Sequence, residues 1–72
     1  MEQDDHLLKF GRRITYLREQ QGLTIDELAL RSGLAVDEIT RIEKGEIDFQ
    51  LTAIYALARG LGVKPARLME GL

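Results

Sequence analysis

The sequence lacks the features that would place it outside the cell or in a membrane. It has no cysteine among its 72 residues, so it can form neither disulfide bonds nor thiolate metal sites. No apolar run approaches the roughly 18–20 residues that span a bilayer, and the acidic, polar N-terminus does not resemble a secretory signal. We expect one domain over residues 1–72, with a flexible tail at 1–5, that is soluble, located in the cytoplasm and without a membrane partner.

Residues that commonly support catalysis are also scarce. His6 is the single histidine, and we interpret it as a tail residue without a metal-binding role. The chain has no cysteine nucleophile, no second histidine for a Ser-His-Asp set and no glycine loop that would hold a phosphate. We interpret Gly60, Gly62 and Gly71 as residues that interrupt or end helices, without a role in ligand binding. The sequence therefore predicts no enzyme activity, no cofactor and no metal site.

Periodic apolar residues predict an all-α chain of five helices, separated by glycines, and no strands. The expected helices cover about residues 4–21, 25–32, 36–44 and 51–59, with a short fifth helix from Pro65 onward. The residues Thr24-Ile25-Asp26-Glu27 form a capping box, in which the threonine oxygen accepts from an amide of the first turn and the glutamate reaches back. The apolar residues expected to face inward are Leu7, Phe10, Ile14, Leu17, Ile25, Leu28, Ala29, Ile39, Ile42, Leu51, Ile54, Leu57, Ala58, Leu61, Leu68, Met69 and Leu72.

The segment 24–45 has the layout of a helix-turn-helix, with two short helices joined by a tight turn at Gly33. The second of these helices divides into two faces at 100° per residue. Ile39 and Ile42 lie on the inner face, and Glu43 lies at the boundary. The residues on the outer face are Val36, Asp37, Thr40, Arg41 and Lys44. This polar face could present side chains to base edges and phosphates.

Short motifs throughout the chain resemble the Cro/C1-type (XRE) helix-turn-helix family, which includes phage repressors and restriction-modification controller proteins. The matching residues are Leu28-Ala29, Gly33-Leu34, Ile39, Ile42-Glu43, Gly45 and Leu61-Gly62-Val63. The resemblance extends over about residues 7–69. It implies a compact five-helix, lambda-repressor-like DNA-binding domain, commonly a homodimer on a near-palindromic site.

The resemblance also implies roles for individual residues. The third helix would enter the major groove, and the positions that contact DNA fall on Thr24, Ile25, Val36, Asp37, Thr40 and Arg41. Lys44, on the same outer face, is a further expected DNA contact. Arg18 and Glu43 would form a structural ion pair. Ile25 departs from the family pattern, because relatives often have a glutamine there whose hydrogen bonds isoleucine cannot make.

Several outer residues also have a structural interpretation. Asp37 lies in the first turn of its helix, where a carboxylate interacts favourably with the helix dipole. Arg41 could be a solvated arginine that balances Glu38, and Lys44 could interact with the carboxyl end of the same helix. Tyr16 and Tyr55 could be exposed or could lie at an interface.

Charge leaves two functions open. The chain carries a net charge of −2, and the segment 35–48 alone carries −3, whereas DNA-binding proteins usually have a basic surplus. The first function is sequence-specific binding to double-stranded DNA as a transcriptional regulator. Its homodimer would form through the fourth and fifth helices, with Tyr55, Val63, Met69 and Leu72. The second is a protein-interaction module, for example antitoxin-like, whose acidic face meets a basic protein partner.

Overall fold

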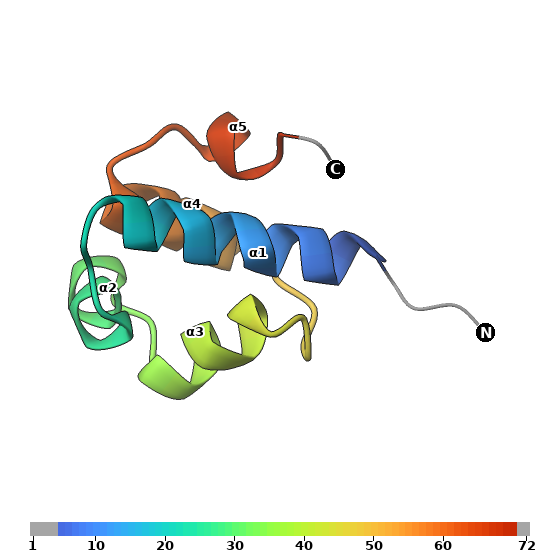
Figure 1. The fold of residues 1–72 in the computed structure, drawn as a ribbon, viewed down its shortest axis with the longest axis horizontal. Helices are drawn as coiled ribbons and strands as arrows, with labels where there is room; N and C mark the ends of the chain where they lie inside the picture. The colour runs from blue at the N-terminus through green and yellow to red at the C-terminus, as the bar shows by residue number, and fades with distance from the viewer. Residues whose placement is uncertain (1–4, 71–72) are drawn as a thin grey trace.

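The computed structural model describes residues 5–70 and has five α-helices and no strand over that range (Figure 1). The helices are α1 (Asp5–Gln20), α2 (Ile25–Ser32), α3 (Val36–Glu43), α4 (Leu51–Leu61) and α5 (Pro65–Leu68). The all-α, five-helix prediction is confirmed. Within the described range, every helix is too short or too polar to cross a membrane.

The predicted helix ends are correct to within two residues, with two informative differences. Helix α1 begins at Asp5 and includes His6 in its first turn, so the interpretation of His6 as a tail residue is wrong. The expected start of this helix at residue 4 lies outside the described residues. The last residue of α4 is Leu61, two residues further than predicted. Gly62 caps the helix with a φ of 70°.

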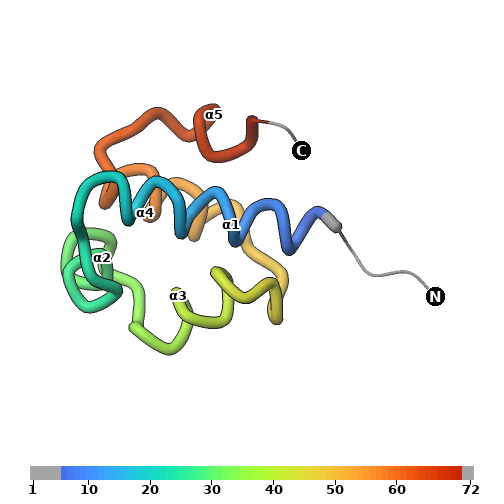
Figure 2. Tube along the Cα trace, in the orientation of Figure 1, coloured from blue at the N-terminus to red at the C-terminus, as the bar shows by residue number. Residues whose placement is uncertain are grey.

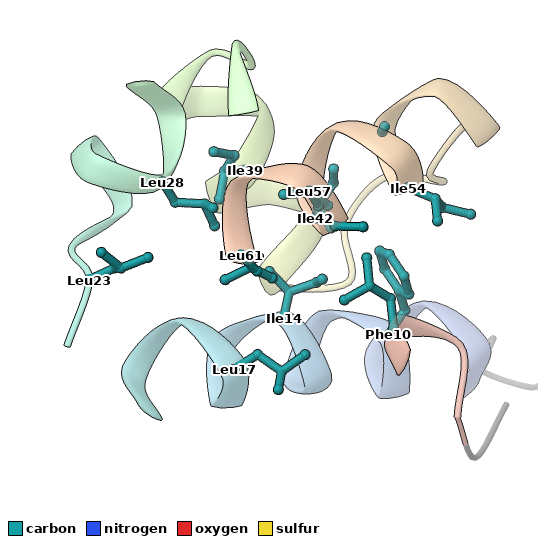
Figure 3. Close-up of a cluster of buried hydrophobic side chains, with 13 residues drawn as sticks. Phe10, Ile14, Leu17, Leu23, Leu28, Ile39, Ile42, Ile54, Leu57 and Leu61 are labelled. Atoms are coloured by element: carbon teal, nitrogen blue, oxygen red, sulfur yellow. The ribbon is translucent and has the colours of Figure 1, made fainter. Parts of the chain in front are cut away.

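Helix α1 packs mainly against α3, and α4 packs mainly against α2; α1 crosses the molecule in front of α4 (Figures 1 and 2). Helices α2 and α3 lie on one side of this pair, and α5 lies on the other. The large side chains that are fully buried are Leu68 and, labelled in Figure 3, Phe10, Ile14, Leu28, Ile39, Ile42, Leu57 and Leu61. These side chains come from all five helices, so every helix contributes to one shared core. Burying a side chain of this size stabilises a protein by about 1.5–3 kcal/mol.

The loop between α3 and α4 is held to the core by an aromatic pair. The ring of Phe49 stacks on that of Phe10, with 3.9 Å between the ring centroids. The planes of the two rings are inclined by 21°, so the rings lie face to face. The pair therefore connects the loop after α3 to the N-terminal half of α1.

Two residues of the predicted core, Leu51 and Met69, are exposed, and Met69 is 36% exposed. Leu51 was expected to face inward, but its side chain is 66% exposed. It is the first residue of α4 and, at 100° per residue, it lies about 105° from the centre of the buried stripe of this helix. The stripe that reaches the core is instead formed by Ala53, Ile54, Leu57 and Leu61, all of which are buried.

Two glycines inside helices allow neighbouring helices to approach closely. A Cβ atom on Gly11 of α1 would overlap the backbone carbonyl oxygens of Ile42 and Glu43 at the end of α3. A Cβ atom on Gly60 of α4 would lie 3.1 Å from the backbone nitrogen of Ser32 in α2. The interpretation of Gly60 as a residue that interrupts or ends a helix is therefore wrong, because it lies within α4 and packs against α2.

We predict that Gly11→Ala lowers the free energy of unfolding by roughly 1–3 kcal/mol, the usual cost of overpacking. Alanine is the better helix former by about 1 kcal/mol, but here its methyl group would push α1 away from the α3 backbone. The matched control is Gln20→Ala at the exposed end of the same helix, which should leave stability unchanged or slightly raised. Denaturant unfolding followed by circular dichroism measures both, and equal stability of the two variants would contradict the close contact.

Candidate nucleic-acid interface

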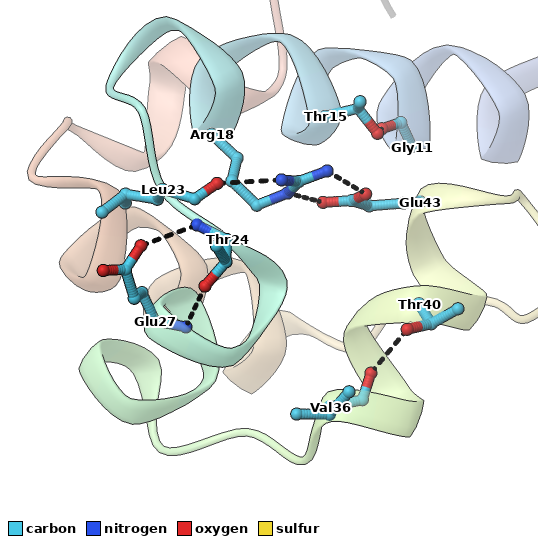
Figure 4. Close-up of polar contacts among 9 residues, drawn as sticks. All are labelled: Gly11, Thr15, Arg18, Leu23, Thr24, Glu27, Val36, Thr40 and Glu43. Atoms are coloured by element: carbon cyan, nitrogen blue, oxygen red, sulfur yellow. Dashed lines mark hydrogen bonds and ion pairs between the residues drawn. The ribbon is translucent and has the colours of Figure 1, made fainter.

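Local hydrogen bonds fix both ends of α2. The Thr24 hydroxyl accepts from the backbone nitrogen of Glu27 at 3.0 Å, and the Thr24 nitrogen donates to a Glu27 carboxylate oxygen at 2.8 Å (Figure 4). The capping box predicted from the sequence is therefore confirmed. At the other end Gly33 has a φ of 81°, and its nitrogen donates to the Ala29 carbonyl, which closes the helix and begins the turn into α3.

A bidentate ion pair joins α1 to the last residue of α3 (Figure 4). The Nε and Nη2 atoms of Arg18 donate to the two carboxylate oxygens of Glu43 at 2.8 and 3.0 Å, and Nη1 donates to the Leu23 carbonyl at 2.9 Å. Only 12% of the Arg18 side chain and 9% of the Glu43 side chain are exposed. The hydrogen bond to Glu43 raises the pKa of Arg18, against the opposing effect of burial. The guanidinium therefore stays charged and holds α3 and the start of α2 together.

The outer face of α3 carries a short apolar edge beside a charged pair. Val36 is 42% exposed, and the Thr40 hydroxyl donates to the Val36 carbonyl at 2.9 Å. Arg41 Nε lies 3.2 Å from a carboxylate oxygen of Asp37, and both side chains are largely exposed. Arg41 therefore pairs with Asp37, one turn earlier, and not with Glu38 as the structural interpretation of the sequence supposed.

The remaining predicted site residues differ in how accessible they are. Lys44 is exposed and follows the last residue of α3, where its backbone nitrogen bonds to the Thr40 carbonyl. Thr24 is exposed, with its oxygen engaged in the cap. Ile25 is partly buried and packs against the hydrophobic core. Its side chain therefore has a packing role that accounts for an apolar residue at this position.

Most of the acidic side chains near α3 have partners within the protein. Glu43 is bound by Arg18, Asp37 is bound by Arg41, and a carboxylate oxygen of Asp48 accepts the backbone N–H of Phe49 at 2.8 Å. The Arg18 charge comes from outside the segment 35–48. With Arg18 counted beside the segment 35–48, the net charge of this region is −2 instead of −3.

One exposed apolar residue was missed by the sequence interpretation. Leu30, on α2, is 85% exposed. It lines a shallow depression of about 560 Å³ together with Asp26, Ala29, Gly33, Leu34 and Val36. The sequence signal was a leucine two positions beyond Leu28 on an amphipathic helix, which places it off the inward face.

The expected dimer residues have mixed accessibility. Tyr55 is 53% exposed and Met69 is 36% exposed, whereas Val63 is partly buried against the core. Leu72 lies outside the described residues. The exposed Leu51, four residues before Tyr55, adds an apolar side chain to the same face of α4.

Comparisons with known proteins agree with this geometry. A profile of the helix-turn-helix family (HTH_3) matches residues 14–68. An uncharacterised HTH-type transcriptional regulator of Sinorhizobium fredii, y4dJ, is 32% identical over 59 residues, which cover 82% of this chain and 77% of that protein. The restriction-modification controller protein C.AhdI from Aeromonas hydrophila is 37% identical, with a TM-score of 0.84 over 86% of this chain and 94% of its own. The wild-type controller protein C.Esp1396I is 25% identical, with a TM-score of 0.86 over 94% of this chain and 88% of its own.

We predict that Glu43→Ala lowers the free energy of unfolding by about 3 kcal/mol or more, because it leaves the Arg18 guanidinium largely buried without its carboxylate. Glu70→Ala is the matched control. Glu70 pairs with Arg13 at 3.2 Å, but its side chain is 57% exposed, so its loss should cost less than about 1 kcal/mol. Thermal and denaturant unfolding measure the difference, and similar small losses in both variants would remove the special role of the Arg18–Glu43 pair.

Proposed function

The chain belongs to the helix-turn-helix family (HTH_3) of DNA-binding transcriptional regulators, and we propose that it binds a near-palindromic DNA site as a homodimer with α3 in the major groove. The observation that carries the proposal is that α3 has one face packed against the protein and an opposite face exposed to solvent. Ile39 and Ile42 are buried and Glu43 is fixed by Arg18, so the opposite face is left for a ligand. Such a regulator acts where the chromosome lies, which we expect to be the cytoplasm.

Polar side chains on α3 match groups that DNA presents. Arg41 has its Nε atom close to Asp37, which leaves its two terminal nitrogens for the acceptors of a guanine in the major groove. Lys44 and the exposed start of α2 at Thr24 would contact phosphates, which set the position of the protein on the duplex. We assign base contacts to Val36, Asp37, Thr40 and Arg41. Ile25, which packs against the hydrophobic core, holds the start of α2 in place.

Two copies would place their α3 helices in successive major grooves, about 34–36 Å apart. We propose that the copies meet through α4 and α5, with Leu51, Tyr55 and Met69 supplying exposed apolar area. Helices α3 and α5 lie on opposite sides of α1 and α4 (Figure 1). A contact between copies on the far side would therefore leave the outer face of α3 open to DNA.

The second function, a protein-interaction module, is supported by one observation. The apolar depression around Leu30 borders Val36 on α3 and is edged by Asp26. A partner with apolar anchors and basic residues would suit it. Salt dependence separates the two functions, because phosphate contacts make the logarithm of the binding constant fall steeply with the logarithm of salt concentration.

The proposal is tested by selecting DNA from a random pool with the purified full chain. Enrichment of an inverted repeat, bound with a steep salt dependence, is the expected result. No enrichment at low salt would overturn DNA binding and would favour the protein-interaction module. Enrichment of a single half-site would overturn the dimer while leaving DNA binding in place.

We predict that Arg41→Ala weakens binding to the selected site by about tenfold or more, as expected for losing a bidentate contact to guanine. The control is Arg12→Ala, which removes the same charge from an exposed position on α1 and should change affinity little. Fluorescence anisotropy with labelled duplexes measures both. Equal losses for the two variants would mean that Arg41 contributes only overall charge.

We predict that Tyr55→Glu shifts the protein from dimer to monomer and weakens binding to the full inverted repeat. A carboxylate at this position would need to be desolvated within the interface. Tyr16→Glu is a closely matched control, since Tyr16 on α1 is also 53% exposed. Sedimentation velocity over a range of concentrations measures the shift. Dissociation caused by Tyr16→Glu alone would move the interface to α1.

A further inference from the structure

The outer face of α3 has an apolar edge that the polar contacts above leave unused. Val36 lies at the start of α3 with 42% of its surface exposed, and Thr40 follows one turn later on the same side. An exposed valine contributes nothing to hydrogen bonding with base edges or phosphates. This part of the helix must therefore face an apolar group if it contacts DNA closely.

The internal hydrogen bond of Thr40 decides which of its groups a ligand meets. Its hydroxyl donates to the Val36 carbonyl at 2.9 Å (Figure 4), so the hydroxyl hydrogen is already used. Toward a ligand, Thr40 then has a methyl group and the lone pairs of its oxygen. Together with the two methyl groups of Val36, it forms a small apolar surface on a helix that is otherwise polar outside.

The major groove offers one matching apolar group, the C5-methyl group of a pyrimidine. Thymine carries it in ordinary DNA, and 5-methylcytosine carries the same group. We propose that Val36 and Thr40 contact such a C5-methyl group within each half-site, an inference that rests on the DNA binding proposed above. Asp37 and Arg41, on the adjacent side of α3, then address the polar edges of neighbouring bases.

The test uses the selected DNA site and the full chain. Each thymine in one half-site is replaced in turn by deoxyuridine, which removes only the methyl group. We expect one or two positions at which affinity falls about fourfold, as for a methyl group that is no longer buried. A specific site without any such position would overturn the methyl contact but not DNA binding, and failure to select any site would overturn both.

Protein variants then assign the contact to its residues. In Val36→Ala or Thr40→Ser, the deoxyuridine effect at the sensitive position should shrink, because each variant removes part of the partner apolar surface, and in the double variant it should disappear. Thr40→Val keeps a methyl group and removes the hydroxyl, so it should retain the effect. A deoxyuridine effect that persists unchanged in both Val36→Ala and Thr40→Ser would overturn the assignment.

Two further arms complete the test. Leu30→Ala removes the most exposed apolar side chain of the neighbouring depression and should leave the deoxyuridine effect intact; if it abolishes the effect, the contact belongs to the depression and not to α3. At the sensitive position, cytosine and 5-methylcytosine are also compared. A gain of about fourfold on methylation means that either pyrimidine methyl is accepted, and no gain restricts the contact to thymine. Both of these results support the methyl contact.

Discussion

The ion pair between Arg18 and Glu43 is the interaction on which the placement of α3, and with it the proposed DNA-binding face, depends. Its three hydrogen bonds reach the last residue of α3 and the Leu23 carbonyl, directly before the threonine that caps α2. One side chain of α1 therefore sets both halves of the helix-turn-helix. Two turns earlier on α1, Gly11 lets the backbone come close to the end of α3, so both an ion pair and close packing join α1 to Glu43.

The distribution of charge is better described by partners than by totals. Three of the five acidic side chains in the segment 35–48 contact Arg18, Arg41 or the backbone of Phe49. Exposed charges further apart than about 8–10 Å are largely screened at physiological salt. A ligand at the outer face of α3 therefore responds mainly to the side chains on that face, where Arg41 and Lys44 lie towards the carboxyl end of the helix.

Much of the fold could be predicted because its signals are local. The capping box at Thr24, the glycine turns and the two faces of α3 each depend on residues within one or two turns of one another. The partner of Arg41 was also within reach, since Asp37 lies at the favourable i, i+4 spacing. A glycine inside a helix lowers its stability by about 1 kcal/mol relative to alanine. Its presence there can therefore indicate that a neighbouring element packs closely against it, as at Gly11 and Gly60.

Features that depend on distant parts of the chain could not be predicted in this way. The stacking of Phe49 on Phe10 joins residues that are far apart in sequence. For the candidate site, the sequence pattern marked the outer face of α3, whereas the use of the Thr40 hydroxyl within the helix required coordinates.

The backbone contact at Gly11 has a consequence for how much the operator can vary. Because α1 and the end of α3 touch without an intervening side chain, α3 cannot slide or rotate against its scaffold without breaking close-packed contacts. In the proposed dimer, the distance between the two recognition helices would then be a fixed property of the protein. An operator whose half-sites are spaced differently would have to bend or twist to fit. The protein would then also discriminate between operator sequences by how easily their uncontacted base steps deform.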